Sequence, residues 1–177
     1  MSNQELYDTN AITAVILAGG RGSRMGGVDK GLQLFRGQPL VTHAMQRLSA
    51  QQRNAPISIL INANRNVEQY AGMGATVVVD SLQDFQGPLA GFLAALDACS
   101  TPYLLTVPCD SPLFPLDLAQ RMSDALLRSD AQIAVAMAPE HVAGGATVLR
   151  SQPVFCLMRT EVRESLRLFL ESGGRKV

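Results

Sequence analysis

The run ITAVILAGGRGSRMGGVDK (Ile12–Lys30) joins an apolar segment, Ile12–Leu17, directly to a loop with five glycines between Gly19 and Gly27. The apolar segment is rich in β-branched residues and has no polar alternation, which is typical of a strand buried on both faces. Glycines let backbone amides approach and surround phosphate oxygens, so the loop predicts a phosphate-binding site at the end of this strand.

Apolar runs of the same kind recur along the chain and alternate with helical patterns. Further strands are predicted at Ile57–Ile61, Thr76–Val79, Tyr103–Val107 and Ile133–Met137. Helices are predicted at Leu40–Gln52, Leu89–Ala98 and Leu116–Leu127, the last two amphipathic. Strands that alternate with helices of this length predict βαβ units and a mainly parallel central sheet, so the expected fold class is three-layered α/β.

The last third of the chain has a weaker pattern. Pro139–Gln152 is predicted to be loop-like apart from a short run at Ala146–Leu149, Val154–Met158 is predicted as an edge strand, and Glu161–Ser172 as a helix. No repeat or linker interrupts the sequence, and 177 residues suit one core, so residues 1–177 are expected to form a single domain.

Composition and charge exclude several classes of protein. With 15 basic and 15 acidic residues the formal net charge is zero, so no basic field is available to hold nucleic acid or an anionic membrane. Hydrophobic residues make up 47% and charged residues 17%, far from the composition of a disordered chain. No apolar run approaches the roughly 18 residues of a membrane-spanning helix, and the three cysteines form no CxxC pair. We therefore expect a cytoplasmic globular protein without disulfides, with neither nucleic acid nor a membrane as a partner.

Two familiar phosphate-binding motifs do not fit the glycine-rich loop. A Walker A loop has a lysine directly after its last glycine, whereas Val28 stands at that place here. A dinucleotide fingerprint that starts at Gly20 meets Met25 at its last glycine, so NAD binding is disfavoured. The cations of the loop are Arg21, Arg24 and Lys30. Together with the glycines they favour a clamp for a polyphosphate.

Polar residues follow the other predicted strands, at Asn62–Arg65, Asp80–Ser81 and Pro108–Pro112. Ligands of open α/β sheets bind beyond the carboxyl ends of strands, so these groups are expected to meet at one site. Mg²⁺ takes one or two carboxylates and completes its shell with phosphate oxygens and water. Asp110 fits that role best because prolines on both sides fix its backbone. Asp80 is either a second ligand or a turn residue.

Residues suited to other chemistries lack partners at useful spacing. His43 falls in a predicted helix and His141 in a loop, with no metal-ligand spacing around either. Cys109 has no nearby base and is predicted to be a small buried residue. No serine has the GxSxG turn of a Ser-His-Asp hydrolase, so that chemistry is excluded.

Several motifs, taken in order, resemble the molybdenum cofactor guanylyltransferases. They are LAGGRGSRMGGVDKGL (Leu17–Leu32), INANR (Ile61–Arg65), DSLQDFQGPLAG (Asp80–Gly91), PCDSP (Pro108–Pro112) and QPVF (Gln152–Phe155). The glycine-rich motif is common to many nucleotidyltransferases, whereas DKGL together with NANR and GPLAG is much narrower. The resemblance implies transfer of GMP from GTP to the phosphate of molybdopterin, with release of pyrophosphate. It also implies a Rossmann-like nucleotidyltransferase fold and Mg²⁺ as cofactor.

The resemblance, together with the glycines and charges of the loop, predicts roles for particular residues. Arg24 and Lys30 are expected to act in catalysis by neutralising the departing pyrophosphate, and Asp110 by binding Mg²⁺. The nucleotide site is expected to include Leu17, Ala18, Gly19, Gly20, Gly22, Lys30, Asn62, Asp80, Gly91 and Asp110. Family members usually continue past the GGR segment toward the pterin site, while this sequence stops at Val177. The residues of this sequence therefore support GTP binding more strongly than complete turnover.

Base selectivity stays open at this stage because a glycine loop contacts phosphates rather than bases. The alternatives are a cytidylyltransferase for molybdopterin, a sugar-phosphate nucleotidyltransferase, and a noncatalytic GTP-binding or cofactor-carrier protein. GTP and molybdopterin are the expected substrates. Transient contacts with cofactor-biosynthesis proteins or with the recipient molybdoenzyme are the expected protein partnerships.

Overall fold

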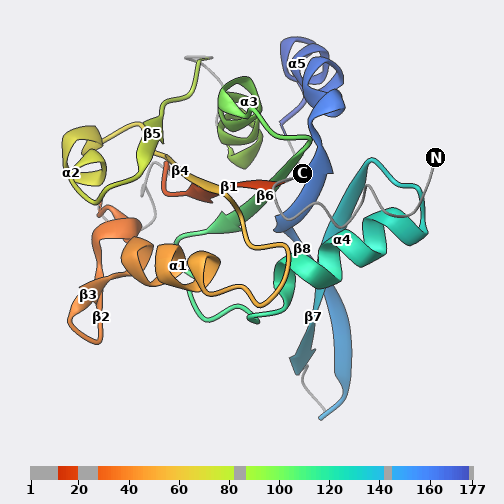
Figure 1. Ribbon diagram of the computed structural model, residues 1–177, viewed down its shortest axis with the longest axis horizontal. Helices are drawn as coiled ribbons and strands as arrows, with labels where there is room; N and C mark the ends of the chain where they lie inside the picture. The colour runs from red at the N-terminus through yellow and green to blue at the C-terminus, as the bar shows by residue number, and fades with distance from the viewer. Residues whose placement is uncertain (1–11, 20–27, 82–86, 142–144, 176–177) are drawn as a thin grey trace.

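The computed structural model describes residues 12–19, 28–81, 87–141 and 145–175. One six-stranded sheet runs through it in the order β5-β4-β1-β6-β8-β7. Its strands are β1 (Ile12–Leu17), β4 (Ser58–Asn62), β5 (Thr76–Val78), β6 (Tyr103–Pro108), β7 (Ile133–His141) and β8 (Thr147–Arg159). β1 is parallel to β4 and β6, β4 is parallel to β5, and β8 runs antiparallel to β6 and β7. The expected α/β class with a mainly parallel sheet is confirmed (Figure 1).

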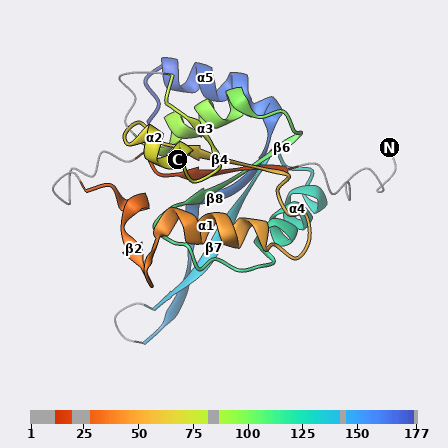
Figure 2. The same ribbon diagram turned by 60° about the vertical axis from the view of Figure 1, so that its left-hand side comes forward.

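Helices cover both faces of the sheet. They are α1 (Leu40–Ser49), α2 (Val67–Ala71), α3 (Pro88–Ala98), α4 (Leu118–Arg128) and α5 (Arg163–Glu171), with 3₁₀ turns η3 (Lys30–Leu32) and η4 (Thr160–Val162). A small hairpin, β2 (Leu34–Phe35) and β3 (Gln38–Pro39), precedes α1. α3 and α5 lie on one face and α1 and α4 on the other, as Figure 2 shows. Within the described ranges, no helix has the length and apolarity needed to cross a bilayer.

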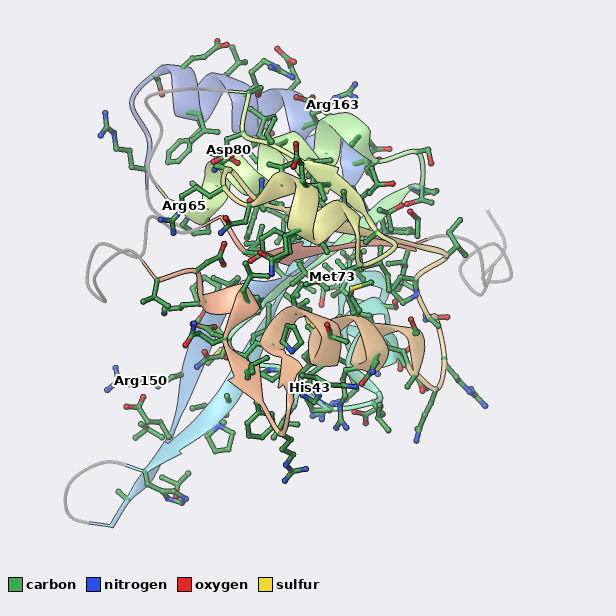
Figure 3. The ribbon with its side chains drawn as sticks, turned by 90° about the vertical axis from the view of Figure 1, so that its left-hand side faces the viewer. His43, Arg65, Met73, Asp80, Arg150 and Arg163 are labelled. Atoms are coloured by element: carbon green, nitrogen blue, oxygen red, sulfur yellow. The ribbon has the colours of Figure 1, made fainter. Side chains whose placement is uncertain are left out.

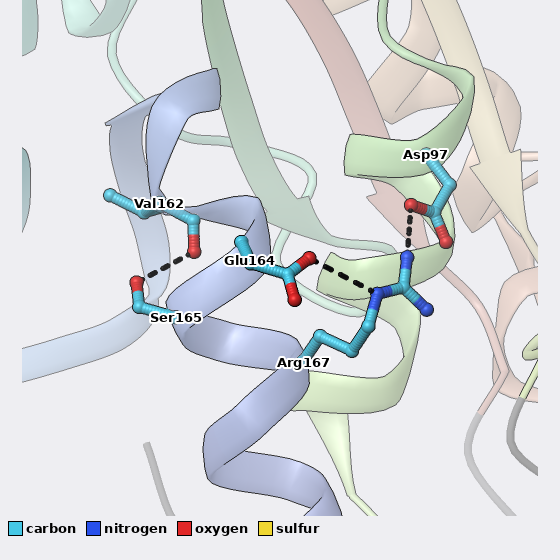
Figure 4. Close-up of polar contacts among 5 residues, drawn as sticks. All are labelled: Asp97, Val162, Glu164, Ser165 and Arg167. Atoms are coloured by element: carbon cyan, nitrogen blue, oxygen red, sulfur yellow. Dashed lines mark hydrogen bonds and ion pairs between the residues drawn. The ribbon is translucent and has the colours of Figure 1, made fainter.

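α3 is enclosed by its neighbours rather than exposed on one side. Every residue from Leu89 to Leu96 is buried, because the helix packs against the sheet and is covered by α5. Arg167 of α5 donates to Asp97 at the end of α3 at 2.7 Å, with Glu164 beside it (Figure 4). The prediction of an amphipathic helix was therefore wrong here: a helix covered on both sides is apolar all round.

The chain after α4 differs most from the prediction. β7 and β8 form a long hairpin over much of Pro139–Gln152, which was expected to be loop-like. β8, which contains Val154–Met158, lies between β6 and β7 and is not an edge strand. The edge is β7, and its residues Ile133, Val135 and Met137 are exposed rather than buried on both faces. The far half of the hairpin projects away from the body (Figure 1). Its residues are therefore exposed and lack the apolar pattern of a buried strand, so the sequence predicted a loop.

Candidate active site

The carboxyl ends of β1, β4, β5 and β6 meet at one edge of the sheet because these strands are parallel neighbours. Leu17 at the end of β1 pairs with Asn62 on one side and with Pro108 on the other. The strand order reverses at β1, since β4 and β5 extend the sheet in one direction and β6 in the other. Ligands bind at such switch points, so the segments that follow these strands form the candidate site.

Hydrogen bonds tie the start of the glycine-rich loop to both neighbouring strands. The Ala18 amide donates to the Asn62 carbonyl at 2.8 Å, and the Cys109 amide donates to the Leu17 carbonyl at 3.1 Å. A Cβ on Gly19 would stand 3.0 Å from Asn62 Oδ1, so the loop begins close against β4. Four other residues predicted in this loop, Gly20, Arg21, Gly22 and Arg24, lie outside the described residues.

Two asparagines hold the carboxylate of Asp80. Asn62 Nδ2 donates to Asp80 Oδ1 at 2.8 Å, and Asn64 Nδ2 donates to Asp80 Oδ2 at 2.7 Å. The Asp80 amide returns a hydrogen bond to Asn64 Oδ1 at 2.8 Å. Asn62 and Asp80 were predicted as nucleotide-site residues, whereas Asn64 was expected near the site only as part of the polar segment Asn62–Arg65. Residues two apart in an extended segment point to the same side, and that spacing was the signal.

Gly91 forms the wall of the site next to this network. A Cβ at Gly91 would lie 2.3 Å from Asn62 Oδ1 and 3.0 Å from Leu17 Cδ2, which no side chain tolerates without movement. The carboxamide oxygen of Asn62 thus faces Gly91 on one side and Gly19 on the other. The structure brings these four residues together, as the sequence predicts.

Lys30 and Asp110 meet across the switch point. Lys30 Nζ donates to Asp110 Oδ2 at 3.0 Å, which joins η3 to the end of β6. Their side chains are 49% and 41% exposed. A solvated pair of this kind contributes at most about 1 kcal/mol to stability. Opening the pair therefore costs little, and both groups are available to a ligand.

Asp110 suits Mg²⁺ in one particular binding mode. Across the described ranges there is no group of three or more His, Cys, Asp or Glu residues that could hold a metal without a ligand. A single exposed carboxylate instead suits the mode in which phosphate oxygens and water complete the shell of the ion.

Two residues near the end of α1 support the loop that follows Asp110. Arg47 Nε donates to the Phe114 carbonyl at 2.5 Å. Gln51 is buried, its Nε2 donates to the Pro115 carbonyl at 3.0 Å, and its Oε1 accepts from the Ala119 amide in the first turn of α4 at 2.9 Å. These bonds hold the segment that follows Asp110 against the end of α1, which limits the movement of the Asp110 backbone.

Both histidines are engaged elsewhere. His43 Nε2 lies 2.6 Å from the Phe35 carbonyl, and Figure 3 shows it on α1, well separated from Asp80. His141 Nδ1 lies 3.0 Å from the Thr147 hydroxyl on the β7–β8 hairpin. Each histidine therefore has a hydrogen-bond neighbour outside the candidate site.

Cys109 is next to Asp110 but its side chain is buried. Its side chain is 5% exposed. Burial, with smaller contributions from the Asp110 and Asp29 carboxylates, raises the pKa of Cys109 to about 12. A thiol with this pKa stays protonated at neutral pH, so the residue fills space beneath the site, as predicted.

The fold matches known nucleotidyltransferase structures. The crystal structure of molybdopterin-guanine dinucleotide biosynthesis protein A from Archaeoglobus fulgidus aligns with a TM-score of 0.66 at 20% identity, over 93% of this chain and 75% of that chain. The structure of 4-diphosphocytidyl-2C-methyl-D-erythritol synthase from Anaerococcus prevotii aligns with a TM-score of 0.68 at 16% identity, over 99% and 81%. At these identities the likeness concerns the fold alone, and it defines the class as a nucleotidyltransferase fold.

Sequence comparison narrows this class. The MobA-like NTP transferase domain matches residues 14–177. The molybdenum cofactor guanylyltransferase of Acidovorax sp. (strain JS42) is 56% identical over 173 residues, which are 97% of this chain and 80% of that protein. The protein of the same name from Bordetella pertussis is 55% identical over 171 residues, 97% and 82% of the two chains. The chain therefore belongs to the molybdenum cofactor guanylyltransferase family, as its motifs indicate.

Proposed function

We propose that the protein transfers GMP from GTP to the phosphate of molybdopterin and releases pyrophosphate. The observation that carries the proposal is the contact between Lys30 and Asp110 at the switch point of the sheet, 3.0 Å apart. It places a cation suited to phosphates beside a carboxylate suited to Mg²⁺. Relatives that are 55 and 56% identical and named for guanylyl transfer to the molybdenum cofactor support the choice of substrates.

The transfer is a nucleotidyl displacement at the α-phosphorus of GTP. An oxygen of the molybdopterin phosphate forms a bond to that phosphorus, and the bond to the bridging oxygen of the β-phosphate breaks. The electron pair leaves with pyrophosphate. A phosphate nucleophile is already anionic, so no general base is required, which agrees with the engagement of His43 and His141 elsewhere. In such transfers the protein mainly positions the reactants and stabilises charge.

Lys30 has the clearest role in stabilising that charge. Its ammonium stands at the site on a side chain that is half exposed, so it can move from Asp110 to a phosphate oxygen when a nucleotide binds. A cation placed where negative charge gathers on the leaving pyrophosphate lowers the barrier to its departure. Arg24, in the preceding loop, shares this role in the proposal.

Asp110 would hold Mg²⁺ together with phosphate oxygens of the nucleotide. When bound, the ion supplies positive charge that offsets the charge of the transferring phosphate. On the nucleoside side, Asn62 and Asn64 orient the Asp80 carboxylate as an acceptor for hydroxyl or N–H groups. Gly19 and Gly91 leave room for the Asn62 carboxamide because neither carries a side chain.

A transfer assay with competing nucleotides tests the proposal. The protein is incubated with Mg²⁺, molybdopterin and equal concentrations of GTP and CTP, and the dinucleotides and pyrophosphate are quantified after chromatography. We expect the guanine dinucleotide, with one pyrophosphate released for each molybdopterin consumed. A cytosine dinucleotide as the main product would assign the chain to cytidylyl transfer. Nucleotide binding without pyrophosphate release would assign it to the noncatalytic class.

A further inference from the structure

The carboxylate of Asp29, which directly precedes Lys30 and the 3₁₀ turn η3, accepts three hydrogen bonds. Asp29 Oδ1 accepts from the Tyr70 hydroxyl at 2.5 Å and from the Gly31 amide at 3.2 Å. Asp29 Oδ2 accepts from Asn66 Nδ2 at 2.9 Å. Asn66 and Tyr70 belong to α2 and its first cap, so the carboxylate fastens η3 to a helix from another part of the chain.

Tyr70 is a fixed support for this contact. It is 0% exposed and lies in the hydrophobic core, with only its hydroxyl group committed to Asp29. Burial and the neighbouring Asp29 raise the pKa of Tyr70 well above its usual value, so the phenol remains a hydrogen-bond donor. A donor of this kind is positioned by the packing around its ring.

Gly31 brings the turn into direct contact with the same support. A Cβ at Gly31 would lie 2.3 Å from the Tyr70 hydroxyl oxygen and 3.3 Å from the Cβ of Ala18. η3 is therefore wedged between α2 and the end of β1. Lys30 stands between two residues that are both held, Asp29 by hydrogen bonds and Gly31 by close packing.

We propose that Asp29, through Tyr70 and Asn66, is a positioning residue that fixes the backbone of Lys30 so that the ammonium stands over Asp110 and the phosphate subsite. The ligand that this serves is a polyphosphate, and the inference rests on the proposed function for its identity as GTP. The Asp29 carboxylate accepts hydrogen bonds from Tyr70, Asn66 and the Gly31 amide, so both of its oxygens have partners within the protein. A cation held in place before the ligand arrives loses less freedom on binding than a mobile one.

A double-mutant cycle with Lys30 separates positioning from a general structural role. Tyr70→Phe removes only the hydroxyl, and Asp29→Asn keeps the shape of the side chain. Each is made alone and together with Lys30→Ala, and kcat and KM for GTP are measured. We expect each variant to lower kcat/KM by about tenfold to a hundredfold in the wild-type background. In the Lys30→Ala background each should change kcat/KM by less than about twofold, because the group being positioned is gone.

Asp97→Asn is the matched control, since it disturbs a carboxylate that accepts a 2.7 Å bond from Arg167 (Figure 4). Asp97 lies near the C-terminal end of α3, whereas Gly91 lies in the first turn of that helix. Asp97→Asn should shift the unfolding midpoint while kcat/KM stays at the wild-type value. Undiminished effects of Tyr70→Phe and Asp29→Asn in the Lys30→Ala background would overturn the positioning role. A kcat/KM equal to that of the wild-type protein in both Tyr70→Phe and Asp29→Asn would also overturn it.

Calorimetric binding of Mg²⁺-tripolyphosphate distinguishes this inference from the proposed function, because the probe has no base and needs no molybdopterin. If Tyr70→Phe lowers the affinity of the wild-type protein but causes no further loss when it is added to Lys30→Ala, the positioning role is supported even when the wild-type protein transfers no GMP. Transfer by the wild-type protein, with unchanged affinity and turnover in Tyr70→Phe, overturns the positioning role and leaves the function standing. Neither transfer nor tripolyphosphate binding by the wild-type protein overturns both.

Discussion

Lys30 and Asp110 are 80 residues apart in the sequence, and their side chains meet at 3.0 Å where β1 and β6 end. The contact joins the segment after the glycine-rich loop to the segment after β6. Because both side chains are well exposed, its significance lies in chemistry rather than in stability.

The first prediction concerns this contact. Asp110→Ala should lower the rate of GMP transfer by about a hundredfold or more, as loss of a group that stabilises charge in the transition state does. The free energy of unfolding, measured with urea, should change by less than about 1 kcal/mol because the pair is solvated. Glu140→Ala is the control, since it breaks a similarly exposed 2.9 Å pair with Arg150 on the hairpin and should leave transfer unchanged. Near-normal turnover in Asp110→Ala would remove the metal assignment.

A second prediction concerns the wall of the site. Gly91→Ala should lower the free energy of unfolding by about 1–3 kcal/mol, since the added methyl group meets Asn62 Oδ1 and Leu17. It should also raise KM for GTP, because Asn62 must move. Gly72→Ala provides the comparison: its Cβ meets only ordinary contacts at 3.5 Å and its φ is −62°. That variant should be neutral or stabilising by up to about 1 kcal/mol with unchanged KM. Equal behaviour of the two variants would contradict the role of Gly91.

A third prediction concerns the orientation of Asp80. Asn64→Ala removes a donor to Asp80 Oδ2 and an acceptor for the Asp80 amide. Each such bond is worth about 0.5–1.5 kcal/mol, so we expect KM for GTP to rise up to about tenfold. The free energy of unfolding should fall by less than about 1.5 kcal/mol, because Asn64 is exposed and water replaces its partners. Gln46→Ala, which removes an exposed 3.3 Å bond to Gln38, is the control in the GTP titration. An unchanged KM in Asn64→Ala would show that Asp80 needs no such support.

A fourth prediction concerns the thiols and alkaline pH. The pKa of Cys109 is raised from 9.0 to about 12, so its contribution to stability is fully present below pH 9 and is lost as the pH rises toward 12. Cys109→Ala should therefore lose stability less steeply than the wild-type protein over this range, by up to about 1.4 kcal/mol per pH unit. At pH 8 a disulfide reagent should modify Cys99 first, because Cys109 and Cys156 are buried. Parallel stability curves for the two proteins would contradict the buried, protonated thiol.

The parallel half of the fold was predictable because its signal is local. β1 was predicted with its observed bounds, Ile12–Leu17, since a strand buried on both faces is apolar throughout. α4 was predicted for a different reason: only one side of this helix is covered, so its apolar residues form a stripe. The position of β8 inside the sheet depends on antiparallel pairing with β6, a long-range contact that leaves no periodic trace in the segment itself.

Some residues of the candidate site were likewise predictable from local sequence, whereas one contact was not. Lys30, Asn62, Asp80 and Asp110 were predictable because each follows a predicted strand or belongs to a family motif. The contact between Asp29 and Tyr70 was not, because Tyr70 lies on a five-residue helix that the periodicity did not indicate. Tyrosines in a core and aspartates before a turn are both common, and only the fold shows that these two meet.

The fate of labelled phosphate tests the proposed reaction itself. Molybdopterin and Mg²⁺ are supplied to an excess of protein with GTP labelled in the α- or the γ-phosphate, and the products of one turnover are separated. Attack at the α-phosphorus predicts all of the α-label in the dinucleotide and all of the γ-label in pyrophosphate. The γ-label in inorganic phosphate, or the α-label in free GMP, would mean that water rather than molybdopterin accepts the group and would contradict guanylyl transfer.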